Sequence, residues 1–169
     1  MIKIKKILFI AFTMFLIGVT SLRAYEVSKI DEAGPADVRF MDMAVSAAKK
    51  SMASQGPASG AVIILNGAWR STGIPESGKT AEEVAYLKSR LSKLNQATVY
   101  TVNEPITAIV NLLNGAEVEA IYFTNPREVV VEAGIYPASA YDDSAIDSSI
   151  SQAPVYQLPF EDAMLLLSK

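Results

Sequence analysis

Apolar positions recur along this chain with two different spacings, and these spacings predict where helices and strands lie. Over residues 37–54 they repeat every three or four positions, which predicts an amphipathic helix with Asp37 as its N-cap. Residues 60–65 form a continuous apolar run, which is typical of a buried strand. Asn66 and Gly67 follow directly and predict a tight hairpin, because both turn positions need positive φ angles. Residues 68–72 are then the returning strand.

The second half of the chain alternates between strands and helices. Buried strands are predicted over 96–101 and 118–123, with a short strand over 155–158. Helices are predicted over 80–93, from Pro105 to Asn114, after Asn125 and over 159–168, with a short helical turn near 146–150. Because parallel strands need crossover helices, this order predicts an α/β fold. We expect a three-layer α/β/α sandwich whose mixed sheet has roughly five strands, with an antiparallel hairpin at one side.

The N-terminal residues have the pattern of an export signal. Lys3, Lys5 and Lys6 precede an apolar run over 7–19, which is shorter than a comfortable membrane span. We therefore expect a signal peptide over 1–24, cleaved after Ala24, and a secreted or periplasmic protein. The alternative is that the segment stays uncleaved as a membrane anchor. Residues 25–36 are predicted to form a loose N-terminal arm, and 37–169 the folded domain.

Composition excludes several kinds of chemistry. The 169 residues include no His and no Cys, so the chain can form neither a disulfide nor a zinc site of the usual Cys/His type. Ser-His-Asp and Cys-His nucleophilic machinery is excluded for the same reason. The predicted signal peptide carries four of the fifteen basic residues and none of the eighteen acidic ones, so the remaining chain is strongly acidic. We expect no nucleic-acid partner, since phosphate contacts need basic side chains.

Four short segments combine into a larger pattern. They are Gly60-Ala-Val-Ile-Ile, Thr80-Ala-Glu-Glu-Val, Tyr100-Thr-x-x-Glu-Pro and Ala120-Ile-Tyr-Phe, and they follow one another in that order. Together they resemble the cytidine deaminase-like superfamily, and especially its guanine deaminase and tRNA adenosine deaminase branch, over nearly all of the chain after the arm. The resemblance implies the α/β/α fold, a cleft for a nucleobase and a homodimer as a possible state.

In that superfamily three His or Cys ligands hold a zinc ion, and a glutamate moves protons between the activated water and the leaving ammonia. The resemblance places the three ligand positions at Ala81, Ile106 and Ile109, and the glutamate at Glu83. A substrate-contacting Asn of that branch corresponds to Pro75. All three ligand positions therefore carry side chains that cannot coordinate a metal.

We accordingly expect a catalytically inactive deaminase-like protein, a pseudoenzyme without a cofactor that binds an unknown protein or small ligand. Ile106 and Ile109 would fill the metal cavity with hydrocarbon. Glu83 is either a vestigial proton shuttle or, with Thr80, one half of a capping box at the start of a helix. Candidate ligand-binding residues are Trp69, Asn103 and Glu104, although for Trp69 we favour the interpretation that it covers the sheet.

Three alternatives stay open from the sequence. Carboxylates of Glu82, Glu83 and Glu104 could hold a hard cation such as calcium or magnesium. Glu83 or Glu104 could act as the general base of a different reaction in the same cleft, including a deaminase-type hydrolysis. The cleft could also bind purines without acting on them.

Overall fold

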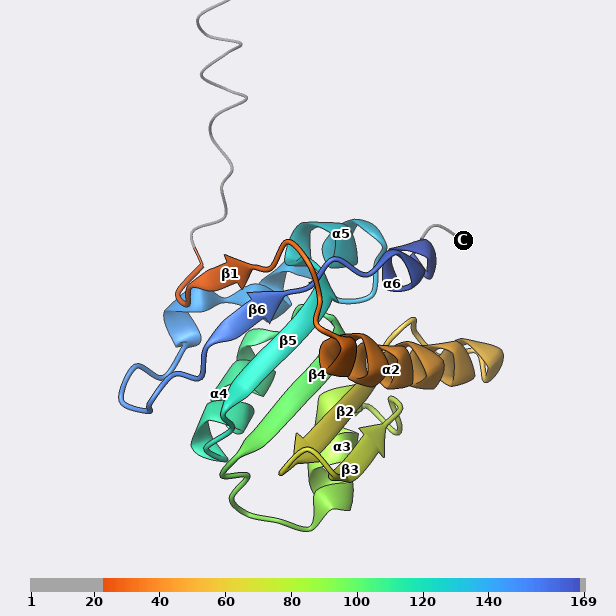
Figure 1. Ribbon diagram of the computed structural model, residues 1–169. Helices are drawn as coiled ribbons and strands as arrows, with labels where there is room; N and C mark the ends of the chain where they lie inside the picture. Colours follow the sequence, from red (N-terminus) through yellow and green to blue (C-terminus); the bar gives the residue numbers. More distant parts are fainter. Residues whose placement is uncertain (1–22, 168–169) are drawn as a thin grey trace, which may run out of the picture.

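The structure, a computed structural model that describes residues 23–167, is built around a mixed sheet with helices on both faces (Figure 1). The six strands of this part of the chain are β1 (Val27–Lys29), β2 (Ala61–Leu65), β3 (Trp69–Gly73), β4 (Ala97–Asn103), β5 (Ala120–Asn125) and β6 (Val155–Gln157). Their order in the sheet is β1-β6-β5-β4-β2-β3. The predicted α/β sandwich is confirmed, with one strand more than the expected five.

Strand directions match the predicted division of the sheet. β2 is antiparallel to both β3 and β4, while β4, β5, β6 and β1 run parallel to one another. At the hairpin tip, Asn66 has a φ angle of 52° and Gly67 one of 69°. The predicted turn is confirmed, because these are the positive φ angles that an Asn-Gly pair accommodates.

The sixth strand comes from the segment that was predicted to be a loose arm. Residues Val27, Ser28 and Lys29 pair with Val155, Tyr156 and Gln157, and so form an edge of the sheet. Three residues are too few to show the alternation of buried and exposed side chains that identifies a strand in a sequence. Backbone hydrogen bonds to β6 therefore order a segment whose composition resembles a linker.

Helices cover the two faces of the sheet unequally. They are α2 (Pro35–Ala53), α3 (Ala81–Ser89), α4 (Thr107–Gly115), α5 (Arg127–Glu132) and α6 (Glu161–Leu165), with short 3-10 helices η1 (Ala138–Tyr141) and η2 (Asp143–Ala145). α2 and α6 contribute to the apolar cluster on one face, and α3 and α4 to the cluster on the other (Figure 1). No helix within residues 23–167 is long and apolar enough to cross a membrane. The predicted signal peptide lies outside the described residues, except for Arg23 and Ala24.

Two predicted helix features differ from the structure. α2 begins at Pro35 with Gly34 as its N-cap, and Asp37 lies inside the first turn, where its carboxylate accepts a hydrogen bond of 3.3 Å from the Gly34 backbone N–H. The turn predicted near 146–150 is replaced by the two 3-10 helices that precede it. The first position of a helix tolerates a proline. α2 can therefore begin at Pro35, two residues before the predicted N-cap Asp37.

The apolar residues Val84, Leu87, Leu91 and Leu94 share one side of the helix predicted over 80–93, but only Val84 and Leu94 are buried. α3 ends at Ser89 because Arg90 adopts a left-handed conformation, and Leu87 and Leu91 are 56% and 38% exposed. The buried positions are mainly small, because the helix lies very close to β3. A Cβ atom added to Gly73 would stand only 1.8 Å from the backbone oxygen of Ala81. This close contact fixes the rotation of α3 and so decides which of its glutamates faces the sheet.

Candidate functional site

A buried glutamate marks the N-terminal end of α3. Glu82 is 1% exposed, and its Oε1 accepts a hydrogen bond of 2.5 Å from the Thr101 hydroxyl on β4. Its Oε2 has no hydrogen-bond partner among the residues that the structure describes. Burial raises the pKa of Glu82, and the hydrogen bond from Thr101 opposes this rise without overcoming it. Glu82 therefore stays a neutral acid over a wider pH range than an exposed glutamate does.

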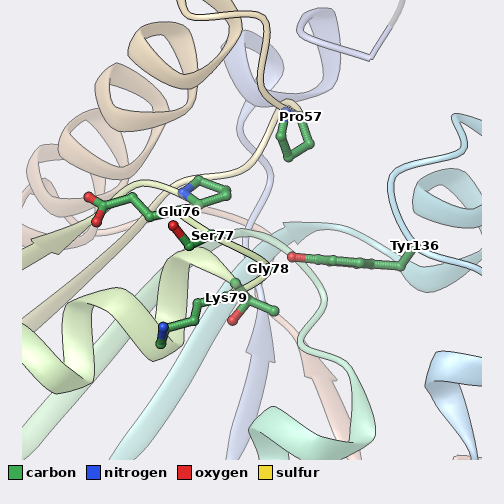
Figure 2. A pocket seen from close by; sticks show the side chains of 8 residues that line it. Pro57, Glu76, Ser77, Gly78, Lys79 and Tyr136 are labelled. Atoms are coloured by element: carbon green, nitrogen blue, oxygen red, sulfur yellow. The ribbon is translucent and has the colours of Figure 1, made fainter.

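An open hollow of about 340 Å³ adjoins the same end of α3. Its lining combines the loop before α3 with a proline and a tyrosine from two other loops: Pro57, Pro75, Glu76, Ser77, Gly78, Lys79, Thr80 and Tyr136. In Figure 2 the Tyr136 side chain points its hydroxyl toward the Ser77–Gly78 turn, while Glu76 and Lys79 extend away from it. The volume is at the lower end of the range for small-molecule sites.

Tyr136 connects this hollow with the buried glutamate. Burial, and after it the charge of Glu82, raises the pKa of the Tyr136 hydroxyl, so the two side chains are within electrostatic reach of each other. The hydroxyl also lies 3.5 Å from that of Ser59. The Tyr136 hydroxyl therefore lies beside that of Ser59, and the Thr101 hydroxyl beside the Glu82 carboxylate.

Glu83, the residue predicted as the proton shuttle, is bonded to Thr80 at the start of α3. The Thr80 backbone N–H donates to its carboxylate at 2.7 Å, and the Glu83 N–H donates to the Thr80 hydroxyl at 3.3 Å. These reciprocal hydrogen bonds form the predicted capping box. The carboxyl group that reaches β4 belongs to the preceding residue, Glu82.

The three expected metal-ligand positions lie at the starts of α3 and α4. Ala81 is the first residue of α3 and is fully buried, Ile106 is the N-cap of α4, and Ile109 is 2% exposed. All three belong to, or pack against, one apolar cluster. Zinc needs nitrogen, sulfur or oxygen donors. These side chains offer none, so they do not fit the metal centre that the fold implies.

Glu104, at the end of β4, carries the most extensive polar network among the described residues. Its carboxylate is fully buried and accepts two hydrogen bonds of 2.9 Å from the Arg23 guanidinium. Arg127 donates two more at 2.9 Å, from its backbone N–H and from Nε. A fifth, also of 2.9 Å, comes from the Tyr25 hydroxyl. The Glu104 carboxylate is therefore bound by three residues from two separate segments, the N-terminal arm and α5.

Arg127 extends this network to the 3-10 helices. Its guanidinium donates to the Asp143 carboxylate at 2.8 and 3.3 Å. The guanidinium carbon also lies 5.2 Å from the ring centre of Tyr141 and 5.7 Å from that of Tyr25, within the range of cation–π attraction. Burial raises the pKa of Glu104, but the hydrogen bonds and charges of Arg23 and Arg127 outweigh it and hold that pKa below its usual value.

The structure does not bring together the three residues predicted to bind a ligand. Asn103 is fully buried, donates to the Ala58 carbonyl at 2.9 Å and accepts from the Asn125 amide at 3.1 Å. Trp69 is 40% exposed and lies at the opposite end of the sheet. It pairs with Leu65, which pairs with the first residue of β4, so six residues of strand, about 20 Å, separate that end from Asn103.

The hard-cation alternative is also not supported. Within residues 23–167 no three carboxylates or other ligand groups gather closely enough to hold a metal ion. Glu104 pairs with arginines, Glu83 caps a helix, and Glu82 bonds to Thr101. Each carboxylate has its own local role, so the three do not act as a set.

Sequence reasoning missed Tyr136 and Arg127 as site residues, and it considered Glu82 only as one of three carboxylates for a hard cation. The stripe of small residues Ala81, Ala85 and Ser89 was the available signal for Glu82, because a stripe of this kind indicates the side of a helix that packs closely. No comparable signal marks Tyr136 or Arg127, which reach their partners through tertiary packing of distant loops.

Comparison with solved structures shows that the fold is that of the cytidine deaminase-like proteins. A tRNA:A34 deaminase that edits A to I at the wobble position matches with a TM-score of 0.58 and 18% identity, over 76% of this chain and 99% of its own. Guanine deaminase from Bacillus subtilis matches with a TM-score of 0.56 and 20% identity, over 78% and 90%. Guanine deaminase from Nitrosomonas europaea matches with a TM-score of 0.59 and 13% identity, over 80% and 84%.

No protein-family profile and no curated protein sequence matches the chain. The similarity to known proteins is therefore one of fold.

Replacing Glu82 tests its buried acid form. Glu82→Gln should raise the free energy of unfolding at pH 7 by about 1–2 kcal/mol, because an amide carries no cost of ionisation in a buried site. The folded pKa is raised, so this gain should be absent below about pH 4, grow as the pH rises through the unfolded-state pKa and level off above the folded one. Urea unfolding at a series of pH values measures this difference in the free energy of unfolding between Glu82→Gln and wild type. Glu83→Gln is the control and should change stability by less than about 0.5 kcal/mol; a Glu82→Gln protein less stable than wild type at pH 7 would contradict the assignment.

Glu104→Gln should have the opposite effect. It removes the buried carboxylate that Arg23 and Arg127 share and should cost about 3 kcal/mol at pH 7. The folded pKa of Glu104 is lowered, so wild type should lose this advantage as the pH falls from the unfolded-state value, about 4.3, through the folded one. The exposed Glu128, which contacts Arg23 at 3.3 Å, provides the control, and Glu128→Gln should cost less than about 0.5 kcal/mol. Equal losses of stability at pH 7 in Glu104→Gln and Glu128→Gln would show that the buried carboxylate contributes no more than the exposed one.

Proposed function

We propose that this protein uses the cytidine deaminase-like fold to bind a partner or a small ligand, outside the cytoplasm, and does not carry out zinc-dependent deamination. The observation that carries this proposal is the replacement of every expected ligand by hydrocarbon at Ala81, Ile106 and Ile109. The chain has no His or Cys elsewhere that could substitute for them. Export is supported by the sequence pattern of residues 1–24.

The hollow beside Thr80 is the proposed binding site. Two proline rings, a tyrosine and a short loop line it, while Glu76 and Lys79 extend away (Figure 2). Such a lining suits a small, flat, uncharged molecule that packs against rings and hydrogen-bonds to the loop or to the Tyr136 hydroxyl. It is less suited to a phosphate or a nucleic-acid strand, because Lys79 is the one basic residue in this lining and the acidic Glu76 lies in it as well.

A second candidate function is a nucleobase or nucleoside hydrolase, or a purine-binding protein, that uses the same cleft. The observation that favours it is Glu82, because a carboxyl group with a raised pKa beside a cleft has the property that general acid–base catalysis requires. The solved structures of similar fold include deaminases of guanine and of adenosine in tRNA. Within residues 23–167 no group of three metal-ligating side chains gathers beside Glu82 to activate water, so we favour binding over hydrolysis.

Zinc content and ammonia release test the lack of deaminase activity. The purified protein, incubated with zinc and dialysed, should retain far less than one zinc ion per chain by elemental analysis. It should release no ammonia from guanine, cytidine or adenosine. An active guanine deaminase assayed in parallel confirms that the assay detects turnover. Stoichiometric zinc together with turnover would overturn the proposal.

Thermal unfolding with nucleobases and nucleosides tests the binding site. A ligand present at about one hundred times its dissociation constant should stabilise the protein by about 2.7 kcal/mol. Tyr136→Ala should remove this shift, because Tyr136 lines the hollow. Trp69→Ala is the matched control and should keep it, because Trp69 lies at the far end of the sheet. A shift that Trp69→Ala removes and Tyr136→Ala keeps would place the site elsewhere, and no shift with any compound would contradict the small-ligand form of the proposal.

A further inference from the structure

The two edges of the sheet differ in how well they are protected against pairing with a further strand. β3 forms one edge and β1 the other (Figure 1). β1 has three residues and ends at Lys29, and both short length and a lysine discourage an edge strand from pairing further. β3 has five residues, with neither lysine nor proline, and among the described strands it pairs only with β2. β3 is therefore the edge that is open to another strand.

The hydrogen bonds at the two ends of β2 show which of its residues face β3. The Asn66 N–H donates to the Gln96 carbonyl at 3.4 Å, and the Val102 N–H donates to the Gly60 carbonyl at 3.1 Å. Both bonds run between β2 and β4, and both use an even-numbered residue on the β2 side. Successive residues of an antiparallel strand bond alternately to one neighbour and to the other. The odd-numbered residues of β2 therefore bond to β3.

The free backbone groups of β3 consequently belong to Arg70 and Thr72. The odd-numbered residues of β2 are paired with Trp69, Ser71 and Gly73, so these three residues use their N–H and C=O groups toward β2. Arg70 and Thr72 direct theirs to the open edge, and both residues are exposed. An incoming strand can therefore form a regular ladder with β3 without breaking any bond to β2.

Exposed apolar side chains border the same edge. Trp69 on β3 is 40% exposed, and Leu87 and Leu91, on α3 and directly after it, are 56% and 38% exposed. Leu87 follows Glu82 by five positions, which is about 140° around the helix. Because Glu82 reaches Thr101 on β4, Leu87 lies on the side of α3 that is turned away from β4. The open strand and these side chains together have the character of an interaction surface.

We propose that β3 pairs with β3 of a second copy of this chain, antiparallel and about a two-fold axis through Ser71, so that one sheet continues through both copies. Arg70 then faces Thr72 of the partner subunit, and Thr72 faces Arg70 of the partner subunit. Each of these two pairs exchanges about two backbone hydrogen bonds, which satisfies the outward N–H and C=O groups of both copies. The same patch serves both subunits, as a two-fold contact requires.

The sequence of β3 suits pairing with itself in this one register. Trp69 stands opposite Gly73 of the partner subunit in a closely spaced pair, where the glycine has no side chain to collide with the indole ring. A shift of the register in one direction would set the two Arg70 side chains directly opposite each other, which is destabilising. A shift in the other direction would move Trp69 past the end of the strand, to a position opposite Pro75.

The pairing also brings the second copy close to the hollow. Pro75 and Glu76, which line the hollow, follow β3 almost directly. When the register of the two β3 strands is continued, the hairpin turn of the second copy, at Asn66 and Gly67, lies beside these two residues. Association of two copies therefore adds a wall to one side of the hollow.

Sedimentation velocity at a series of concentrations tests the association. The purified protein should change from monomer to dimer between about 1 and about 300 µM, the range expected for a small interface. Trp69 is the only tryptophan of the sequence, so its fluorescence should shift to shorter wavelengths over the same range as the contact covers it. A monomer at every concentration would leave this edge to a strand of another protein and would overturn the proposal. So would a dimer that forms with no change in the fluorescence of Trp69.

Substitutions at Thr72 test whether the dimer forms through β3. Thr72→Pro removes an N–H that points away from β2, and it should raise the dissociation constant of the dimer about tenfold or more. The control Thr72→Val keeps this N–H and should change the dissociation constant by less than about twofold. Circular dichroism and the thermal midpoint show whether Thr72→Pro is folded. An unchanged dissociation constant in a folded Thr72→Pro protein would contradict the pairing.

Thr72→Glu tests the register without a proline. It places a carboxylate opposite Arg70 of the partner subunit in both pairs, and it should lower the dissociation constant about fivefold at low salt, because opposite charges attract across strands. The gain should shrink at about 1 M salt, where exposed charges are screened. If Thr72→Pro does not fold, this variant decides alone, and a dissociation constant equal to that of wild type would overturn the proposal.

This inference is independent of the proposed function. Zinc binding or deaminase activity in the assays above would leave the edge of β3 open as before. A monomeric protein would likewise leave the donor-free residues at the starts of α3 and α4 unchanged.

Discussion

The carboxylate of Glu104 is the interaction on which this end of the molecule depends. It lies at the end of β4 and binds the N-terminal arm through Arg23 and Tyr25, and α5 through Arg127. Arg127 in turn binds the 3-10 helices through Asp143. A buried carboxylate without these cations would be too costly to keep ionised. The arm, α5 and the loop after it are therefore fixed in place by the requirement to neutralise a single charge.

The neighbouring N-terminal ends of α3 and α4 are apolar, in contrast to the charged network around Glu104. In this fold they face a cleft, and here they carry Ala81, Ile106 and Ile109, which merge with the apolar cluster beneath α3 and α4. The polar groups beside them are Glu82, whose burial raises its pKa and so favours its neutral form, and the Thr101 hydroxyl that donates to it. This end of the molecule thus keeps a hollow and a buried acid, and no three metal-ligating side chains gather within residues 23–167.

Much of the fold could be predicted from the sequence, because its signals are local. The apolar run before Asn66, the turn itself and the alternation of strands and helices after it all appear in the structure. The site was harder to predict, because it depends on how elements pack. Leu87 and Leu91 lie on the apolar side of the predicted helix but are exposed, because close contact with Gly73 selects small residues at the buried positions of α3. Arg23 and Arg127 are separated from Glu104 by 81 and 23 positions in the sequence, and no sequence pattern indicates that they pair with it.

The central claim is that hydrocarbon occupies the place where this fold elsewhere has a metal centre. The most direct measurement is a crystal structure of the protein grown with zinc, with anomalous diffraction recorded at the zinc absorption edge. The account predicts no anomalous peak between the starts of α3 and α4, with Ile106 and Ile109 packed against Ala81. A strong peak there, within bonding distance of the Glu82 carboxylate, would contradict it.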